Sequence, residues 1–338
     1  MHALVDWRLS LTALSLALAM GLCAPAGAAE EEAGEILAAA PSGLMLRPGW
    51  QPGPQLDSAR AGLGAVVLDG RIYAAGGAGR VNPRDNFEML EPGLNRWLSL
   101  SALPEGLERF GIAAADGRIW VAGGYSAESG RGPIASMWSY DPESDVWQSE
   151  PPMPAARSAF ALIGVEGRLY AVGGADEPGG VFVFDLEARE WSTLDAPAGV
   201  RRRDAGVALA GRDIWFTGGI ENRRAVTRVD IFNLDSQSWR SGPALPEARA
   251  GHALVHDGQR LLALGGRGED LRSTRQSVAT LIPGAAGWQA HTPLPAARTE
   301  AAAVSLEGVV YVIGGGVGGG FFAPFTALDS VDILAPGQ

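Results

Sequence analysis

A pair of adjacent glycines recurs along the chain at nearly regular intervals, and this repeat constrains the fold more than any other feature of the sequence. Successive pairs are separated by 47, 50, 45, 47 and 49 residues. The pairs are Gly76-Gly77, Gly123-Gly124, Gly173-Gly174, Gly218-Gly219, Gly265-Gly266 and Gly314-Gly315. Self-similarity at a fixed period of about 20 to 50 residues is typical of repeat architectures, so we expect one structural unit per glycine pair.

Two further positions keep register with the glycine pairs. A large side chain stands three residues before each pair, and a tryptophan stands 26 or 27 residues before each pair. The large side chains are Tyr73, Trp120, Tyr170, Trp215, Leu262 and Tyr311, and the tryptophans are Trp50, Trp97, Trp147, Trp191, Trp239 and Trp288. Because Trp50 is in register with the others, residues 48–62 form the end of a repeat whose beginning is absent from that part of the chain.

The missing beginning lies at the other end of the chain. The segment SVDILAPGQ at residues 330–338 aligns with SVATLIPGAAGW, which runs up to Trp288, and it stops before a tryptophan. The two fragments together make one complete repeat. We therefore expect the strand near Trp50 to pair with the C-terminal segment, which would also cover a sheet edge that is otherwise open to another chain.

Each repeat divides into four short strands separated by turn signals. In the third repeat these are RSAFALIGV, RLYAVGG, VFVFD and EWSTL, with a tight EG turn between the first two. Gly-Gly at the end of the second strand, an aromatic residue three positions earlier and a Trp that opens the fourth strand resemble the kelch repeat. The resemblance covers residues 48–338 and implies an all-β fold, a six-bladed β-propeller closed by its N-terminal strand.

The first 47 residues are different in character. Residues 1–29 resemble a secretory signal peptide, with Arg8, an apolar run from Leu9 to Leu22 and a small-residue stretch before Glu30. The apolar run is shorter than the roughly 20 residues of a membrane-spanning helix. We therefore expect cleavage, a secreted or periplasmic protein that does not span the membrane, and a flexible acidic lead-in over residues 30–47.

Composition excludes several kinds of site. The chain has 38 acidic and 27 basic residues, which argues against nucleic acid as a partner. Its one cysteine, Cys23, lies in the expected signal peptide, so the mature chain is expected to have no disulfide, thiolate metal site or cofactor. His252 and His256 share one face of a predicted strand, and we interpret them as packing residues rather than metal ligands. Signatures of hydrolases such as G-x-S-x-G and H-E-x-x-H do not occur in the sequence.

Loop lengths indicate which face of the propeller carries the function. The spacing from Gly-Gly to the following Trp varies between repeats, being shortest from Gly173 to Trp191 and longest from Gly123 to Trp147, whereas the spacing from Trp to the next Gly-Gly is nearly constant. The variation is expected in the loop after the second strand of each blade, and variable loops on a rigid scaffold usually carry function. This face is called the loop face below, and the opposite one, which carries the turns between first and second strands, the hairpin face.

Arginines recur where each innermost strand is expected to begin on the loop face. They are Arg60, Arg109, Arg157, Arg203 within the run Arg201 to Arg203, Arg249 and Arg298. Around one opening they would attract anions, but arginine at this place also recurs in kelch repeats, where it pairs with carboxylates or backbone carbonyls. Glu108, Asp204 and Glu300 lie within two residues of an arginine and are candidate partners. Both interpretations stay open.

The segment GGGVGGGFFAPFTALDS follows the last Gly-Gly pair. It contains G-x-G-x-x-G, but no helix start follows, so we do not expect a dinucleotide site. Its three aromatic rings, Phe321, Phe322 and Phe325, either lie over the central channel or face a partner.

Two functions follow from these features. The first is an exported binding module that recognises a protein or a glycan through its loop face, with the arginines, acids and phenylalanines named above as ligand-binding residues. The second is an enzyme similar to the periplasmic kelch mutarotases, in which arginines would hold the carboxylate of an acidic sugar such as sialic acid and a nearby acid would move a proton. Fold similarity alone does not decide between them, and we favour binding without catalysis.

Overall fold

A computed structural model describes residues 49–130, 132–174, 180–319 and 322–336. The chain divides into two units, Met1–Gly34 and Glu35–Gln338, and the description here concerns the second. The expected signal peptide (residues 1–29) and acidic lead-in (residues 30–47) lie outside the described residues. No helix in the described part of the chain is long and apolar enough to cross a membrane.

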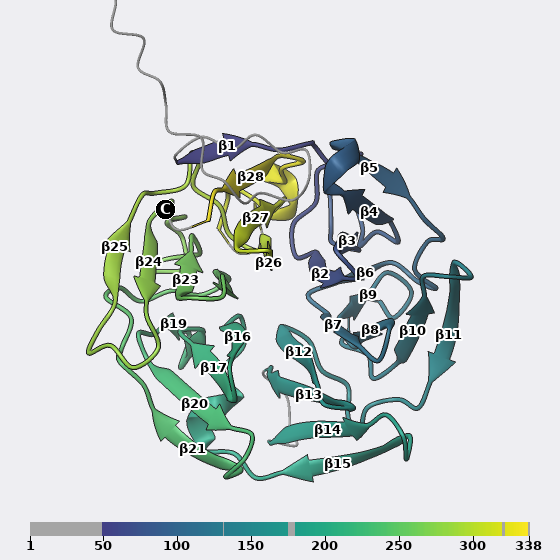
Figure 1. Cartoon of the computed structure of the whole chain (residues 1–338), viewed down its shortest axis with the longest axis horizontal. Helices are drawn as coiled ribbons and strands as arrows, with labels where there is room; N and C mark the ends of the chain where they lie inside the picture. The colour runs from purple at the N-terminus through teal and green to yellow at the C-terminus, as the bar shows by residue number, and fades with distance from the viewer. Residues whose placement is uncertain (1–48, 131, 175–179, 320–321, 337–338) are drawn as a thin grey trace, which may run out of the picture. The chain divides into compact units, whose positions relative to one another are not determined.

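Six four-stranded antiparallel sheets, the blades, contain every described strand longer than two residues (Figure 1). From the axis outward, blade 1 contains β2 (Gly64–Leu68), β3 (Arg71–Ala75), β4 (Phe87–Glu91) and β5 (Arg96–Ser99), and blade 2 contains β7 (Gly111–Ala115), β8 (Arg118–Ala122), β10 (Met137–Asp141) and β11 (Val146–Glu150). Blade 3 contains β12 (Phe160–Val165), β13 (Arg168–Gly173), β14 (Val181–Asp185) and β15 (Glu190–Leu194), and blade 4 contains β16 (Gly206–Ala210), β17 (Asp213–Thr217), β20 (Val229–Asn233) and β21 (Ser238–Ser241). Blade 5 contains β22 (Ala253–His256), β23 (Leu261–Leu264), β24 (Val278–Leu281) and β25 (Gln289–His291), and blade 6 contains β26 (Ala302–Leu306), β27 (Val309–Ile313), β28 (Val331–Leu334) and β1 (Trp50–Pro52).

Short elements decorate the loops between blades. They are the two-stranded ladders β6 (Leu107–Glu108) with β9 (Tyr125–Ser126) and β18 (Ile220–Glu221) with β19 (Arg224–Ala225), and the 3-10 helices η1 (Pro92–Leu94), η2 (Ala198–Arg201) and η4 (Pro324–Thr326).

The blades form a ring in chain order. The innermost strands contact one another in sequence, from β2 through β7, β12, β16, β22 and β26 and back to β2. In blade 6 the outermost strand is β1, which pairs antiparallel with β28 so that Trp50 lies opposite Leu334 and Pro52 opposite Asp332. This confirms the six-bladed all-β fold, and the ring places the innermost strands around one axis (Figure 1).

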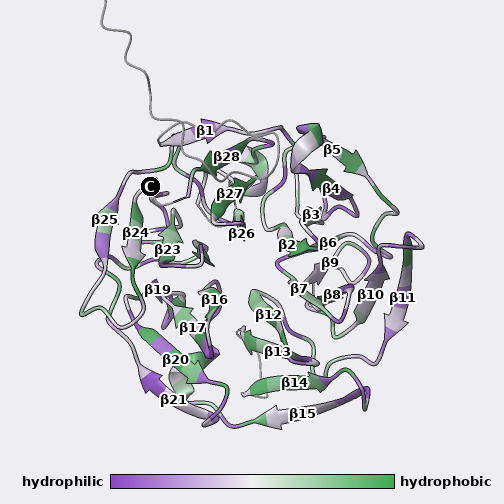
Figure 2. Ribbon diagram, in the orientation of Figure 1, coloured by the Kyte–Doolittle hydropathy of each residue, from purple (hydrophilic) through white to green (hydrophobic). Residues whose placement is uncertain are grey.

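The hydrophobic core lies between blades rather than in one centre. Six of the clusters of buried side chains each draw on two neighbouring blades, from the pair of blades 6 and 1 round to the pair of blades 5 and 6. Strands in the middle of a blade are therefore buried on both faces, as in β14 and β20, whereas β21 and β25 at the rim are more hydrophilic (Figure 2). Burial on both faces explains the continuous apolar runs in these strands.

The Gly-Gly pairs occur where neighbouring blades meet. The N–H of the second glycine of every pair donates to a backbone carbonyl of the next blade, over 2.7 to 3.1 Å, as from Gly124 to Arg157 and from Gly315 to Arg60. The first glycine has φ between 58° and 84°, and in five of the six pairs a Cβ there would lie within 2.8 Å of that carbonyl oxygen. Only glycine satisfies both conditions, which explains the repeat.

Most of the repeating tryptophans at the outer edge of the blades form a hydrogen bond to the loop that precedes their blade. The indole Nε1 of five of them donates to a backbone carbonyl over 2.9 to 3.1 Å, as from Trp97 to Pro54 and from Trp191 to Pro151. Trp239 is the exception, because its buried Nε1 has no partner among the described residues.

Candidate functional site

Four of the six predicted arginines lie inside the blades rather than at an opening. Arg60, Arg157, Arg249 and Arg298 are between 0% and 3% exposed. All four occupy the same position of the repeat when the chain is counted back from Gly-Gly. Of the two interpretations left open for these arginines, a ring of guanidinium groups around one opening is therefore wrong for these four, and the structural interpretation holds.

The buried arginines satisfy backbone carbonyls that the strands leave unpaired. Arg60 donates to the carbonyl of Gly76 over 3.0 Å and forms a salt bridge with buried Glu88. Arg249 donates to the carbonyls of Gly265 and Ser277 over 3.0 and 2.7 Å. Burial lowers the pKa of Arg249 to about 10, against a smaller opposing effect of the nearby carboxylate of Glu247.

The same arrangement repeats in blades 3, 4 and 6. Arg157 lies over the ring of Phe182, 3.9 Å from its centroid, and Arg298 pairs with Asp332. In blade 4 the equivalent residue is Arg202, which pairs with Asp230 over 2.8 Å, and not the predicted Arg203. These side chains stabilise the repeat, in agreement with the structural alternative stated for them above.

Arg109 belongs to a different position, two places closer to Gly-Gly than the buried arginines, and this position surrounds the axis. Its six residues are Gly62, Arg109, Ala159, Asp204, Gly251 and Glu300. The N–H of each donates to the carbonyl of the equivalent residue in the preceding blade, over 2.7 to 3.1 Å, so the six bonds form a closed ring. All six residues have φ between 51° and 68°. This conformation is strained for the four that are not glycine, and such strain tends to occur at functional sites.

Three side chains of this ring meet with Arg267 in a cluster of four charges, in which the side chains of Arg267, Asp204 and Glu300 are buried and that of Arg109 is 21% exposed. Arg109 pairs with Glu300 and lies 3.6 Å from Asp204, and Arg267 lies 2.7 Å from Asp204 and 3.7 Å from Glu300. Burial raises the pKa of Glu300, although Arg109 opposes it, whereas Arg109 and Arg267 outweigh burial and lower the pKa of Asp204. Asp204 and Glu300 are thus partners of an arginine, as the sequence indicated.

A pocket of about 430 Å³ lies on the loop face, above this cluster. We call it the loop-face pocket. Its polar and charged lining includes Arg80, Asn82, Glu108, Arg109, Tyr125, Arg203, Asp204 and Arg267, and its apolar lining includes Val81, Pro83, Ile220, Leu271, Pro324 and Phe325. Of the predicted residues, Glu108, Arg109, Arg203, Asp204 and Phe325 line this pocket.

Two arginines that line the loop-face pocket have no salt bridge to a described residue. The side chains of Arg80 and Arg203 are exposed and make no hydrogen bond or salt bridge to a described residue, whereas Arg109 and Arg267 are neutralised by Asp204 and Glu300. The pocket therefore has room for an anionic group beside an apolar surface.

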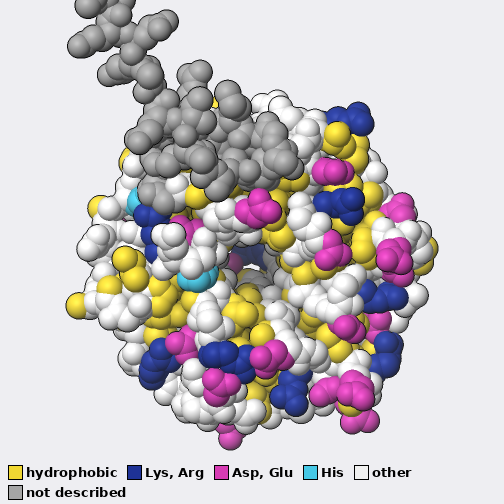
Figure 3. Space-filling view, in the orientation of Figure 1, with side chains coloured by type: hydrophobic (Ala, Val, Ile, Leu, Met, Phe, Trp, Pro, Cys, Tyr) yellow, Lys and Arg dark blue, Asp and Glu magenta, His cyan; other side chains and the backbone are white. Residues whose placement is uncertain are grey.

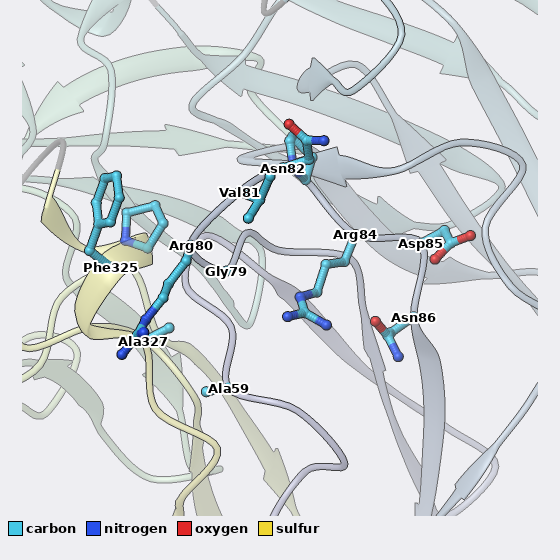
Figure 4. A pocket seen from close by; sticks show the side chains of 12 residues that line it. Ala59, Gly79, Arg80, Val81, Asn82, Arg84, Asp85, Asn86, Phe325 and Ala327 are labelled. Carbon is cyan, nitrogen blue, oxygen red and sulfur yellow. The ribbon is translucent and has the colours of Figure 1, made fainter.

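A second cavity of about 560 Å³ adjoins the loop-face pocket and shares Arg80, Val81 and Phe325 with it (Figure 4). It lies between the loop after β3 and the loop after β27, and Phe325 approaches it from the short helix η4. Phe325 is 47% exposed and Phe322 is 63% exposed. Phe321 lies outside the described residues.

Sequence reasoning missed several residues of the site. Ala78, Tyr125, Ile220 and Arg267 all line the loop-face pocket, and each directly follows a Gly-Gly pair. Arg203 stands one place closer to its pair than buried Arg202, and the same position in blade 2 is Glu108. The number of residues to the next glycine pair could therefore have identified the residues of the pocket, because moving by one residue along the strand turns the side chain in another direction.

His252 packs inside the propeller. His252 is buried and its Nε2 lies 2.9 Å from the Oγ1 of Thr217. Burial, together with Arg249 and Arg202, lowers the pKa of His252 to about 3. Within residues that the structure describes, no group of three or more His, Cys, Asp or Glu side chains is arranged to hold a metal.

Comparison with known proteins agrees with the geometry. The family model described as the kelch motif matches residues 59–104 and 108–154. The chain is similar to Kelch-like protein terF of Aspergillus terreus, at 28% identity over 81% of this chain and 53% of that protein, and to mouse Kelch-like protein 35, at 29% identity over 76% and 43%. Human Kelch-like protein 33 is 35% identical over 28% of this chain and 17% of its own length.

The chain spans about half the length, or less, of these curated relatives. Two of its repeats match the kelch motif, and its described residues form a six-bladed β-propeller, the fold that the resemblance drawn from the sequence implied.

Proposed function

We propose that this propeller is a protein-binding module that holds an extended segment of a partner protein in the loop-face pocket. The observation that carries the proposal is the position of the exposed apolar side chains. Four of them, Val81, Val317, Phe322 and Phe325, lie in the two loops that flank the pocket, after β3 and after β27. The three others among the described residues, Leu94, Val146 and Ile282, lie in turns of three different blades on the hairpin face.

Exposed apolar groups concentrated beside a concave surface favour binding of another macromolecule. Aromatic and arginine side chains contribute most to such contacts, and the pocket combines Phe325 with Arg80 and Arg203. The proposed segment therefore places an apolar side chain against Val81 and Phe325 and a carboxylate near Arg203. The exposed apolar side chains beside the pocket favour a peptide with an apolar side chain over a glycan, which is covered with hydroxyl groups.

The mutarotase alternative has no support in the pocket. Of the arginines expected to hold a sugar carboxylate, Arg60, Arg157, Arg249 and Arg298 are buried. Of the three candidate acids Glu108, Asp204 and Glu300, one of which was expected to move a proton, Asp204 and Glu300 are engaged in salt bridges.

Selection from a random peptide library displayed on phage tests the proposal. Peptides selected on the propeller are measured by fluorescence polarisation against Phe325→Ser and Arg203→Glu. We expect each change to weaken binding by about tenfold or more, which corresponds to about 1.4 kcal/mol. Ile282→Ser, on the hairpin face, and Arg96→Glu, on β5, are matched controls that should change binding less than about twofold.

Selected peptides that bind Phe325→Ser and Arg203→Glu as tightly as the unchanged protein would move the site away from this pocket. A glycan that binds where no peptide does would replace the proposed partner class.

The same proposal includes export, for which residues 1–29 are the support. Mass spectrometry of the protein recovered from the periplasm or medium of a secreting host should show an N-terminus near Glu30. Recovery of the uncleaved chain in the cytoplasm would contradict export without affecting the pocket.

A further inference from the structure

The axis of the ring holds another cavity, on the opposite side of the charge cluster from the loop-face pocket. We call it the central channel. Its volume is about 620 Å³, and its lining comes from the six innermost strands and the residues just before them. Many lining side chains are small, and no Asp, Glu or Arg is among the lining residues. Figure 3 shows the opening of the channel at the centre of the ring.

The innermost strands present hydrogen-bonding groups to the channel. Each of them pairs with one strand only, for example β2 with β3 and β26 with β27. In an antiparallel pair, alternate residues direct their N–H and C=O groups away from the partner strand, so every innermost strand has a free edge. The free edges face the axis. The channel therefore offers small apolar side chains together with backbone donors and acceptors.

The loop-face end of the channel is obstructed. The closed ring of backbone hydrogen bonds through Gly62, Arg109 and Glu300 narrows it. Arg109 of blade 2 contacts Asp204 of blade 4 and Glu300 of blade 6. Because these three blades alternate around the ring, their salt bridges cross the axis, so the hairpin face is the way into the channel.

The opening on the hairpin face is surrounded by acidic residues. Five of the six innermost strands are followed directly by an acid, namely Asp69, Asp116, Glu166, Asp257 and Glu307. Glu166 pairs with Arg212, and Asp257 pairs with Arg260. The other three, on adjacent blades 6, 1 and 2, make no salt bridge to a described residue. Figure 3 shows acidic side chains spaced around the opening.

Turn chemistry accounts for only part of this acidic rim. Asp-Gly is a favoured sequence for a hairpin turn with positive φ, which explains Asp69 and Asp116. Glu307 also has positive φ, at 52°, although glutamate has no such preference. Turn preference therefore does not explain the acid at Glu307.

From this arrangement we infer that the central channel binds a linear aliphatic polyamine, which enters from the hairpin face. Its methylene groups lie against the alanines of the channel, its ammonium groups donate hydrogen bonds to the free carbonyls of the innermost strands, and one ammonium group remains at Asp69, Asp116 and Glu307. This site is separate from the proposed peptide site, and either can exist without the other.

Other ligand classes fit the channel less well. An anion would approach a rim of uncompensated carboxylates, which repel it. A pure hydrocarbon would desolvate the free backbone edges without replacing their hydrogen bonds, which is costly.

Isothermal titration of the full chain with spermine tests the inference. All titrations are made at one ionic strength, since nonspecific attraction to an acidic protein depends on salt. Asp69→Asn/Asp116→Asn/Glu307→Gln changes the rim, and Ala303→Phe fills the channel. Glu143→Gln/Glu187→Gln/Glu190→Gln is the control for the rim, because it removes the same charge from exposed residues of blades 2 and 3.

We expect one equivalent of spermine to bind, about tenfold more weakly to the rim variant, with less than about twofold change in the control. The Ala303→Phe variant, with near-UV circular dichroism to verify its fold, should show no saturable binding. If that variant does not fold, the comparison of the rim variant with its control still decides. Absence of saturable binding to the unchanged protein, or equal weakening in the rim variant and the control, would overturn the inference.

Discussion

Substituting alanine for single glycines of blade 2 measures how much the contact between blades contributes to stability. Gly117 and Gly123 have similar φ, 69° and 61°, so alanine meets the same backbone cost at both, about 1 to 2 kcal/mol. Their surroundings differ. No atom lies within 4 Å of a Cβ built on Gly117, whereas a Cβ on Gly123 would lie 2.4 Å from the carbonyl oxygen of Arg157.

The magnitude follows from what must move in Gly123→Ala. The carbonyl of Arg157 accepts the N–H of Gly124 over 2.8 Å, so moving it away from the new methyl group weakens that bond, at about 1 kcal/mol. The methyl group also meets Phe160, one of whose ring carbons is 2.9 Å away, and overpacking of this kind costs about 1 to 3 kcal/mol. We therefore expect Gly123→Ala to lose about 3 to 6 kcal/mol and Gly117→Ala about 1 to 2 kcal/mol.

Urea unfolding followed by tryptophan fluorescence, together with thermal scans, measures both losses. A difference of about 2 to 4 kcal/mol corresponds to a Tm lower by about 3 to 7 °C in a domain of this size. Equal losses for the two variants would refute the reasoning, because they would show that Gly-Gly is required for backbone conformation alone and not for the approach of the next blade.

Four further predictions concern other features of the fold. Arg298→Met leaves buried Asp332 without a partner and should lower the free energy of unfolding in urea by about 3 to 5 kcal/mol. The double variant Arg298→Met/Asp332→Leu should recover part of that loss, because it removes the unpaired carboxylate. If it recovers nothing, the carbonyl of Gly314 is the main partner of Arg298. Folding lowers the pKa of His252 from its ordinary value of 6.5 to about 3, so on acidification the unfolded state takes up a proton before the folded state does. The stability that His252 contributes is therefore full above about pH 6.5 and falls as the pH is lowered towards 3. Between pH 7 and 5 the Tm of the unchanged protein should fall more steeply than that of His252→Asn, and parallel curves would contradict this. Trp191→Phe removes the indole bond to Pro151 and should cost about 1 kcal/mol more than Trp239→Phe, which removes an unpaired buried N–H; the reverse order in urea unfolding would be inconsistent with these contacts. A chain that begins after Ala61 lacks β1 and should aggregate or melt at a much lower temperature, as shown by light scattering and calorimetry, whereas a monomer with an unchanged Tm would exclude a stabilising role for the pairing of β1 with β28.

The number of blades was readable from the sequence because it depends on local requirements that repeat. Gly123 and its equivalents must be glycine, because they have positive φ and lie too close to the next blade for a Cβ. Trp97 and most of its equivalents hydrogen-bond a backbone carbonyl at the outer edge of the blade. Both residue types therefore recur at fixed intervals. Trp50 stands at the same interval before its glycine pair, which assigns the fragment near residue 50 to the last repeat.

Which arginine faces what was decided only by the tertiary structure. Arg202 and Arg203 are neighbours, yet the first is buried against Asp230 and the second lines the loop-face pocket. Arg109 resembles Arg157 in the sequence, but it stands two positions further along its repeat, where positive φ turns the side chain towards the axis. Counting residues from Gly-Gly separates these classes, but only the packed blades show which class is open to a ligand.

The sequence by itself therefore determined the repeat and the six blades, because both rest on residues that one blade requires within its own strands and turns. The tertiary structure decided the site, because Arg109 of blade 2 has its partners in blades 4 and 6, far along the chain, and meets them only when alternate blades close around one axis.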